Sequence, residues 1–217
     1  MRRVRHGVNG PILWLFEWII ELYAPYVLVR CARFTNSRWQ AQEIGVYTLI
    51  TTCLLAGELD HLGQLGMLVD IMVDLIGPDI VLAGEPPLPW DDEPLIADER
   101  MRELAEALSL LARPAREVLI LHHLAAMQPD DLAKLLRSPP VDIVSKISQA
   151  ETLLAESLTS LRVNAAAPPL PDVRTLLADF AATLDTAWLQ EIAGCAMSYL
   201  AECDGHPTRP PGPCPLN

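Results

Sequence analysis

The sequence predicts an all-α protein made of two small helical domains and a C-terminal amphipathic helical extension. Apolar side chains recur at three- and four-residue spacings along most of the 217 residues, which is the periodicity of a helix that buries one face. The chain is rich in Leu and Ala, and aromatic residues make up only 6% of it, a composition that favours helices. A Pro-rich, acidic segment then interrupts the helical pattern after residue 82, and a chain of this length can bury a core on each side of it.

The first domain, residues 1–82, is predicted to contain three helices. Apolar positions recur over residues 14–26 and 44–55, and a third apolar stretch over residues 62–76 should end at Gly77 and Pro78. The tryptophans of this domain are expected in its core, namely Trp14, Trp18 and Trp39.

The apolar run over residues 12–20 follows three arginines, as a secretion signal would. Glu17 interrupts this run, which is also too short to span a bilayer. We therefore expect a buried amphipathic helix here and no membrane segment.

The acidic linker is assigned to residues 83–97, and the second domain to residues 98–163. Asp98 should cap the first helix of this domain, and Pro114 and Pro129 should each stand in the first turn of a further helix. A fourth helix is expected over residues 141–161.

After the second domain, residues 170–203 carry one sustained apolar helical stripe that needs a surface to pack against. The Pro-rich residues 204–217 are predicted to be disordered.

The segment ARPAREVLILHHLAAMQPDDLAKLLRSPPVDIVSKISQAETLLAESL resembles region 4 of sigma-70-family transcription factors of the extracytoplasmic-function group. Arg116-Glu117-Val118, Asp131-Leu132-Ala133 and the run from Ile143 to Ala150 carry the resemblance. It implies a helix-turn-helix packed through Val118, Leu132, Ala133, Leu136, Ile143, Ile147, Ala150 and Leu154.

The opposite face of the last helix is the candidate functional surface, with Asp142, Ser145, Lys146, Gln149 and Leu153. In a helix-turn-helix this face would lie in the major groove of DNA. The family usually has Gly in the turn and Arg at the positions of Gln149 and Glu151, whereas this turn contains Arg137 and two prolines. Residues 140–161 hold one Lys against three acidic side chains, so the helix is a poor ligand for phosphates. The face is DNA-facing or a repurposed protein interface.

The segment ELYAPYVLVRCARFTNSRWQAQEI resembles the start of region 2 of the same family, through Glu21-Leu22-Tyr23, Tyr26 and Ala41. The resemblance implies polymerase docking near Ala41, where only part of the pattern remains, in Gln42, Glu43, Val46 and Tyr47. Where basic promoter-melting residues should follow, the chain has Asp70, Asp74 and Asp79.

The charge distribution argues against a polyanionic partner. The formal net charge is −12, and residues 41–99 contain twelve acidic side chains and no basic one. The basic residues near the N-terminus are expected on a solvated face or paired with this acidic segment rather than in a nucleic-acid patch: Arg2, Arg3, Arg5, Arg30, Arg33 and Arg38.

Two sets of His and Cys residues could be taken for metal ligands, but neither has the spacing of a metal site. His122 and His123 are adjacent on a helix and point about 100° apart, so they cannot share a ligand set as residues four apart can. Zinc ligands could come from Cys195, Cys203, His206 and Cys214, but their spacing is loose. We predict reduced cysteines, no metal, no cofactor and no enzymatic activity.

The sequence therefore predicts a divergent, cytoplasmic sigma-like transcription regulator that acts mainly through protein contacts, with DNA binding weakened or lost. RNA polymerase, an anti-sigma-like protein or another complex subunit would be the partner. Two alternatives stay open: a functional sigma factor whose DNA contacts come from Arg100, Arg102, Arg113, Arg116, Arg137 and Lys146, and a structural adaptor with no role in transcription.

Overall fold

The computed structural model describes residues 10–83, 94–162, 171–183 and 186–202. In these ranges every regular element is helical, and the single β-type contact is an isolated bridge between Ser37 and Pro94. The predicted all-α fold is confirmed. No helix within these ranges is both long enough and apolar enough to cross a membrane.

The N-terminal half contains three long helices, α1 (Gly10–Cys31), α2 (Arg38–Ala56) and α3 (Leu65–Ala83), and a single 3₁₀ turn, η1 (Leu62–Gln64). Ser37 starts α2, because its side chain accepts a hydrogen bond from the backbone N–H of Gln40. The three helices pack around a shared apolar core that includes Ile19, Ile44, Leu49, Leu65 and Val69.

Helix α3 continues through Gly77 and Pro78, so the predicted end at residue 76 is wrong. Ile80 and Val81 lie beyond the proline and are partly buried against the core, which stabilises the extra turns. Gly77 lets the helix lie close to the end of α1, since a Cβ there would be only 3.0 Å from a ring atom of Phe34.

Two exposed apolar features lie in this half. Trp14 is 65% exposed, so its predicted place in the core is wrong, whereas Trp18 and Trp39 are half-buried. The outward side of α3 is apolar along about four turns, with exposed fractions from 38% to 86% for Met67, Ile71, Leu75 and Leu82.

The second half contains α4 (Glu99–Leu110), α5 (Arg113–Leu119), α6 (Pro129–Leu135) and α7 (Pro140–Leu161). Helix α5 continues as a π-helical turn, η2 (Ile120–Leu124). Asp98 caps α4 by accepting the N–H of Arg100 at 2.8 Å, and prolines stand in the first turns of α5, α6 and α7. The predicted helix starts at Asp98, Pro114 and Pro129 are confirmed.

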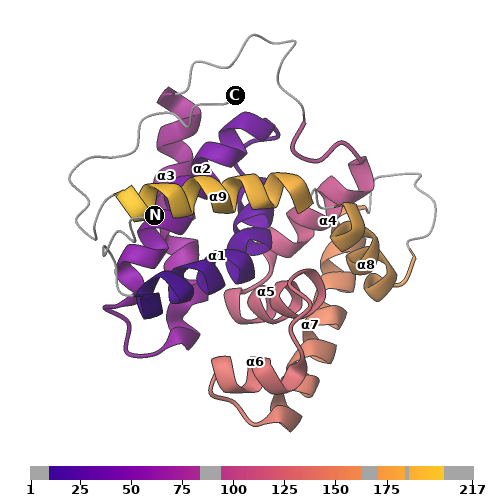
Figure 1. Ribbon diagram of the computed structural model, residues 1–217. Coiled ribbons are helices and arrows are strands. Elements are labelled where there is room, and N and C mark those ends of the chain that lie inside the picture. Colours follow the sequence, from indigo (N-terminus) through magenta and orange to yellow (C-terminus); the bar gives the residue numbers. More distant parts are fainter. Residues whose placement is uncertain (1–9, 84–93, 163–170, 184–185, 203–217) are drawn as a thin grey trace.

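The C-terminal extension forms two helices, α8 (Val173–Thr183) and α9 (Thr186–Glu202), rather than one sustained stripe. Helix α8 packs against η2, α7 and α4, whereas α9 lies across α1 and α2 (Figure 1). The two parts of the apolar pattern therefore bury against different halves of the molecule. The predicted disordered tail, residues 204–217, lies outside the described residues.

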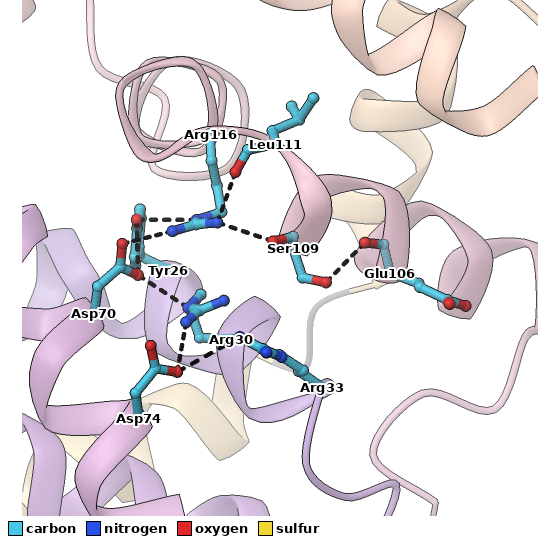
Figure 2. Close-up of polar contacts among 9 residues, drawn as sticks. All are labelled: Tyr26, Arg30, Arg33, Asp70, Asp74, Glu106, Ser109, Leu111 and Arg116. Atoms are coloured by element: carbon cyan, nitrogen blue, oxygen red, sulfur yellow. Dashed lines mark hydrogen bonds and ion pairs between the residues drawn. The ribbon is translucent and has the colours of Figure 1, made fainter. Parts of the chain in front are cut away.

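A buried polar network joins the two halves, and its centre is Arg116 of α5 (Figure 2). The Arg116 side chain donates to Tyr26 Oη at 3.1 Å and to Asp70 Oδ2 at 2.5 Å. Its remaining terminal nitrogen donates to the carbonyl oxygens of Ser109 and Leu111, at 3.0 and 2.9 Å. Arg116 is 5% exposed, so α1, α3, α4 and α5 meet around one buried guanidinium. The division into domains 1–82 and 98–163 stays a prediction.

Arg30 extends the network along α1. Its Nε lies 2.9 Å from Asp70 and its Nη2 lies 2.7 Å from Asp74, while Arg33 lies 3.8 Å from Asp74 (Figure 2). Two of the N-terminal arginines thus pair with the acidic middle segment, as one of the two sequence-based interpretations expected. Arg2, Arg3 and Arg5 lie outside the described residues.

Glu117 forms a second buried contact between the halves. Its carboxylate accepts a hydrogen bond from Tyr23 Oη at 3.1 Å and lies against the backbone of Gly66. A Cβ on Gly66 would be 2.1 Å from the Glu117 carboxylate, so only glycine allows this close approach. Burial raises the pKa of Glu117, and the Tyr23 hydrogen bond opposes that rise.

Arg116→Met should lower the free energy of unfolding by about 3 kcal/mol, because it leaves the partly buried Asp70 carboxylate and the buried Tyr26 phenol without their shared donor. Urea denaturation measures this loss. The matched control is Arg102→Met, which removes an exposed ion pair with Glu99 and should cost under about 1 kcal/mol. Equal effects of the two substitutions would contradict a stabilising role for the network.

Glu117→Gln should change how stability depends on pH. A raised pKa means that ionised Glu117 destabilises the folded protein near neutral pH, and this cost disappears as the pH falls through the raised value. Relative to the Gln variant, the native protein should therefore gain stability as the pH is lowered toward the ordinary glutamate pKa of about 4.3. Tyr23→Phe removes a hydrogen bond to the carboxylate, so it should move this gain to higher pH. Parallel pH profiles for native protein and Glu117→Gln would disprove the expectation.

Candidate interaction surface

The buried face of α7 fixes which side chains the helix presents to solvent. Ile143, Ile147, Ala150, Leu154 and Leu158 are each at most 7% exposed and pack against α5, α6 and α4. Of the eight residues predicted to pack the helix-turn-helix, seven are buried and Leu136 is half-buried. The assignment as a helix-turn-helix stays a prediction.

The turn between α6 and α7 orients the start of α7 through hydrogen bonds to the end of α6. The N–H of Ser138 donates to the carbonyl of Ala133 at 3.0 Å, and that of Arg137 donates to the carbonyl of Lys134 at 3.4 Å. This is a Schellman arrangement, which requires a left-handed residue. Arg137 fills that position with φ = 50°, where glycine would carry no steric cost.

All five residues predicted to form the functional face of α7 are exposed: Asp142, Ser145, Lys146, Gln149 and Leu153. Val141 and Val144 lie beside them, 74% and 56% exposed. We call these seven residues the α7 surface. Three of the seven are apolar, namely Val141, Val144 and Leu153. Lys146 is the single cation of this surface, and its Nζ donates a hydrogen bond to Ser138 Oγ at 2.9 Å.

Glu151, a charged residue of α7 outside this surface, joins α7 to neighbouring helices. The Glu151 carboxylate accepts three hydrogen bonds from the guanidinium of Arg174 of α8, at 2.8 to 3.0 Å. One of its oxygens also lies 3.2 Å from His123 Nε2. Burial and the neighbouring His122 lower the pKa of His123. Glu151 therefore fixes α8 to α7 and does not belong to the α7 surface.

The two histidines do not form a metal site. His122 Nδ1 lies 2.9 Å from the carbonyl oxygen of Met127, and His123 faces Glu151. Within the described residues no group of three or more His, Cys, Asp or Glu side chains is arranged to hold a metal ion. Of the four residues considered as zinc ligands, only Cys195 lies among the described residues, where it is half-buried.

Most of the cations named for a DNA-binding sigma factor have internal partners. Arg100 pairs with Asp98 at 3.0 Å and Arg102 pairs with Glu99. Arg116, which that alternative names as a DNA contact, is 5% exposed and is held in the network that joins the two halves. Arg137 is exposed at the turn, and Arg113 is half-buried.

Helix α9 covers part of α2, the helix to which the family resemblance assigns polymerase docking. Ile192, Ala196 and Leu200 form its buried face, and a Cβ on Gly45 of α2 would be 3.7 Å from two atoms of Ile192. The four docking positions on α2, namely Gln42, Glu43, Val46 and Tyr47, are buried or half-buried. Burial also raises the pKa of Glu43.

This covering was not foreseen from the sequence. The signal that could have revealed it is Gly45, a residue without a side chain in the middle of an apolar helix. Such a gap allows another helix to approach closely, but it does not say which helix fills it.

Comparison with known proteins adds no relative: no family model, curated protein or solved structure matches this chain. The molecule is therefore defined by its own geometry, as an all-α protein with an exposed α7 surface and a covered α2.

Ile192→Asp should release α9 from α2, because it places a carboxylate against Gly45 and Val27, at a cost of about 3 kcal/mol or more. Hydrogen exchange of α2 amides should then become faster while exchange in α7 is unchanged. Gly194→Ala is the matched control, since Gly194 is exposed on α9 with nothing within 4 Å of an added Cβ. Unchanged exchange in α2 with Ile192→Asp would show that α9 does not protect it.

Proposed function

We propose that this protein is a divergent sigma-70-like regulator that acts mainly through protein contacts in the cytoplasm and whose binding to promoter DNA is weakened or lost. The observation that carries the proposal is the composition of the α7 surface. It combines three exposed apolar side chains with one cation and one carboxylate, at the place where a DNA-reading helix needs basic residues. Exposed apolar side chains are typical of protein interfaces.

The use of arginines inside the molecule supports the same proposal. Arg30 and Arg116 are 2% and 5% exposed, and their guanidinium groups are held by Asp70 and Asp74. Phosphate contacts need solvent-accessible cations. Arg30 and Arg116 therefore stabilise the fold and contribute little to electrostatic binding of DNA.

The position of α9 bears on the alternative of a functional sigma factor. In that alternative α2 would dock on polymerase, and α9 lies on α2 near Gly45. A partner could reach the Gly45 side of α2 only after α9 moves, which favours a role in which protein contacts are regulated. The structural adaptor remains the second alternative, separated from the first by the identity of the partner.

Native protein should bind duplex promoter DNA weakly, with a dissociation constant of about 10⁻⁴ M or higher and almost no dependence on salt. The combined variant Asp142→Lys and Gln149→Arg adds two cations to the α7 surface, so its affinity should increase with a slope of log K against log salt near about −2. Fluorescence anisotropy with labelled DNA over a range of salt concentrations measures both. Tight, steeply salt-dependent binding by native protein would favour the functional sigma factor.

The positive test is site-specific photo-crosslinking in native cells. A photo-reactive residue at Gln149 should trap a protein, whereas one at Thr159, exposed at the other end of α7, is the matched control. A trapped polymerase subunit or anti-sigma-like protein supports the proposal. Trapped proteins unrelated to transcription would support the adaptor, and nuclease-sensitive products would point to DNA.

A further inference from the structure

A groove between the two halves, distinct from the α7 surface, is lined by both apolar and charged side chains. Its volume is about 530 Å³, within the usual range for ligand pockets. Trp18 and Leu22 of α1 and Leu135 of α6 supply apolar walls. Asp131, Lys134 and Arg137 lie at the same groove and supply its charged groups.

The charged groups of the groove leave a net positive charge. Lys134 Nζ lies 2.8 Å from Asp131 Oδ1, so these two side chains neutralise each other. Arg137 contributes a further guanidinium, a group whose planar donors match a carboxylate or a related acid. An indole, an aliphatic wall and one surplus guanidinium together match a ligand with an apolar body and one acidic group.

The backbone of Arg137 is the second, independent observation. Arg137 stands in the left-handed region at φ = 50°, where an arginine is strained and a glycine would not be. For the turn alone, glycine would therefore be the less strained residue at this position. Residues held in such conformations cluster at ligand sites, where the surrounding structure maintains the strain.

We propose that this groove binds a small amphipathic organic anion, whose ring system or aliphatic body packs on Trp18 and whose acidic group pairs with Arg137. Because Arg137 lies three residues before the start of α7, an occupied groove fixes the turn that leads into the α7 surface. Binding itself does not depend on the proposed function, whereas regulation of the α7 surface by the ligand does.

The test uses two dyes with the same aromatic body. Anilinonaphthalene sulfonate carries an acidic group, and N-phenylnaphthylamine is its uncharged counterpart. Fluorescence titration of the full chain should show one saturable site for the anionic dye. Arg137→Gly keeps the backbone conformation and removes the guanidinium. The affinity for the anionic dye should therefore fall about tenfold or more, while the affinity for the uncharged dye stays the same.

Two further variants locate the dye. Trp18→Leu should lower the affinity for both dyes, because it removes the aromatic wall of the groove. Ile71→Ser with Leu75→Ser removes apolar surface from the outward side of α3 and should leave the anionic dye's affinity unchanged. Loss of the signal in the α3 variant, or unchanged anionic-dye affinity in Arg137→Gly, would overturn the proposal. Crosslinking from Gln149 is measured separately, so failure of the groove and failure of the proposed function are distinguishable.

Discussion

The structure depends on one buried cation, the guanidinium of Arg116. Burying a charge is costly unless partners replace the water it loses, and Arg116 has four of them: a phenol, a carboxylate and two carbonyl oxygens. These partners come from α1, α3, α4 and the residue after it, so the requirement to satisfy one side chain fixes the relative positions of both halves (Figure 2). The α7 surface lies on a helix that packs against α4 and α5, and Trp18 of the groove lies on α1, so both adjoin helices that meet at Arg116.

The same network buries several of the residues on which the predicted resemblance to sigma factors rests. Tyr23, Tyr26, Arg116 and Glu117 carry part of the family resemblance, and all four are buried where the halves meet. Asp70 and Asp74 of α3, where that resemblance would imply basic residues, both pair with Arg30. Asp70 and Asp74 of the acidic middle segment therefore have internal partners, and their charges stabilise the fold.

Much of the secondary structure could be predicted because it follows from local rules. Caps and first-turn prolines act within one turn of chain, so the starts of α4, α5 and α6 were predictable from Asp98, Pro114 and Pro129. The exposed α7 face followed from helical periodicity. By contrast, the passage of α3 through Pro78, the division of the extension into α8 and α9, and the burial of Arg116 depend on contacts with residues far away in sequence. Arg137 was noticed only as a missing glycine, and its place in the groove needed three-dimensional information.

The shared network also makes each half dependent on the other for solubility. A fragment ending before residue 94 would uncover Asp70 and Tyr26, and would remove the shortest guanidinium contact of Asp70, which Arg116 provides. A fragment beginning at residue 98 would bring the Arg116–Glu117 pair and the apolar residues around it to the surface. The linker between the halves is therefore a poor place to divide the gene for expression, even though its composition is that of a domain boundary.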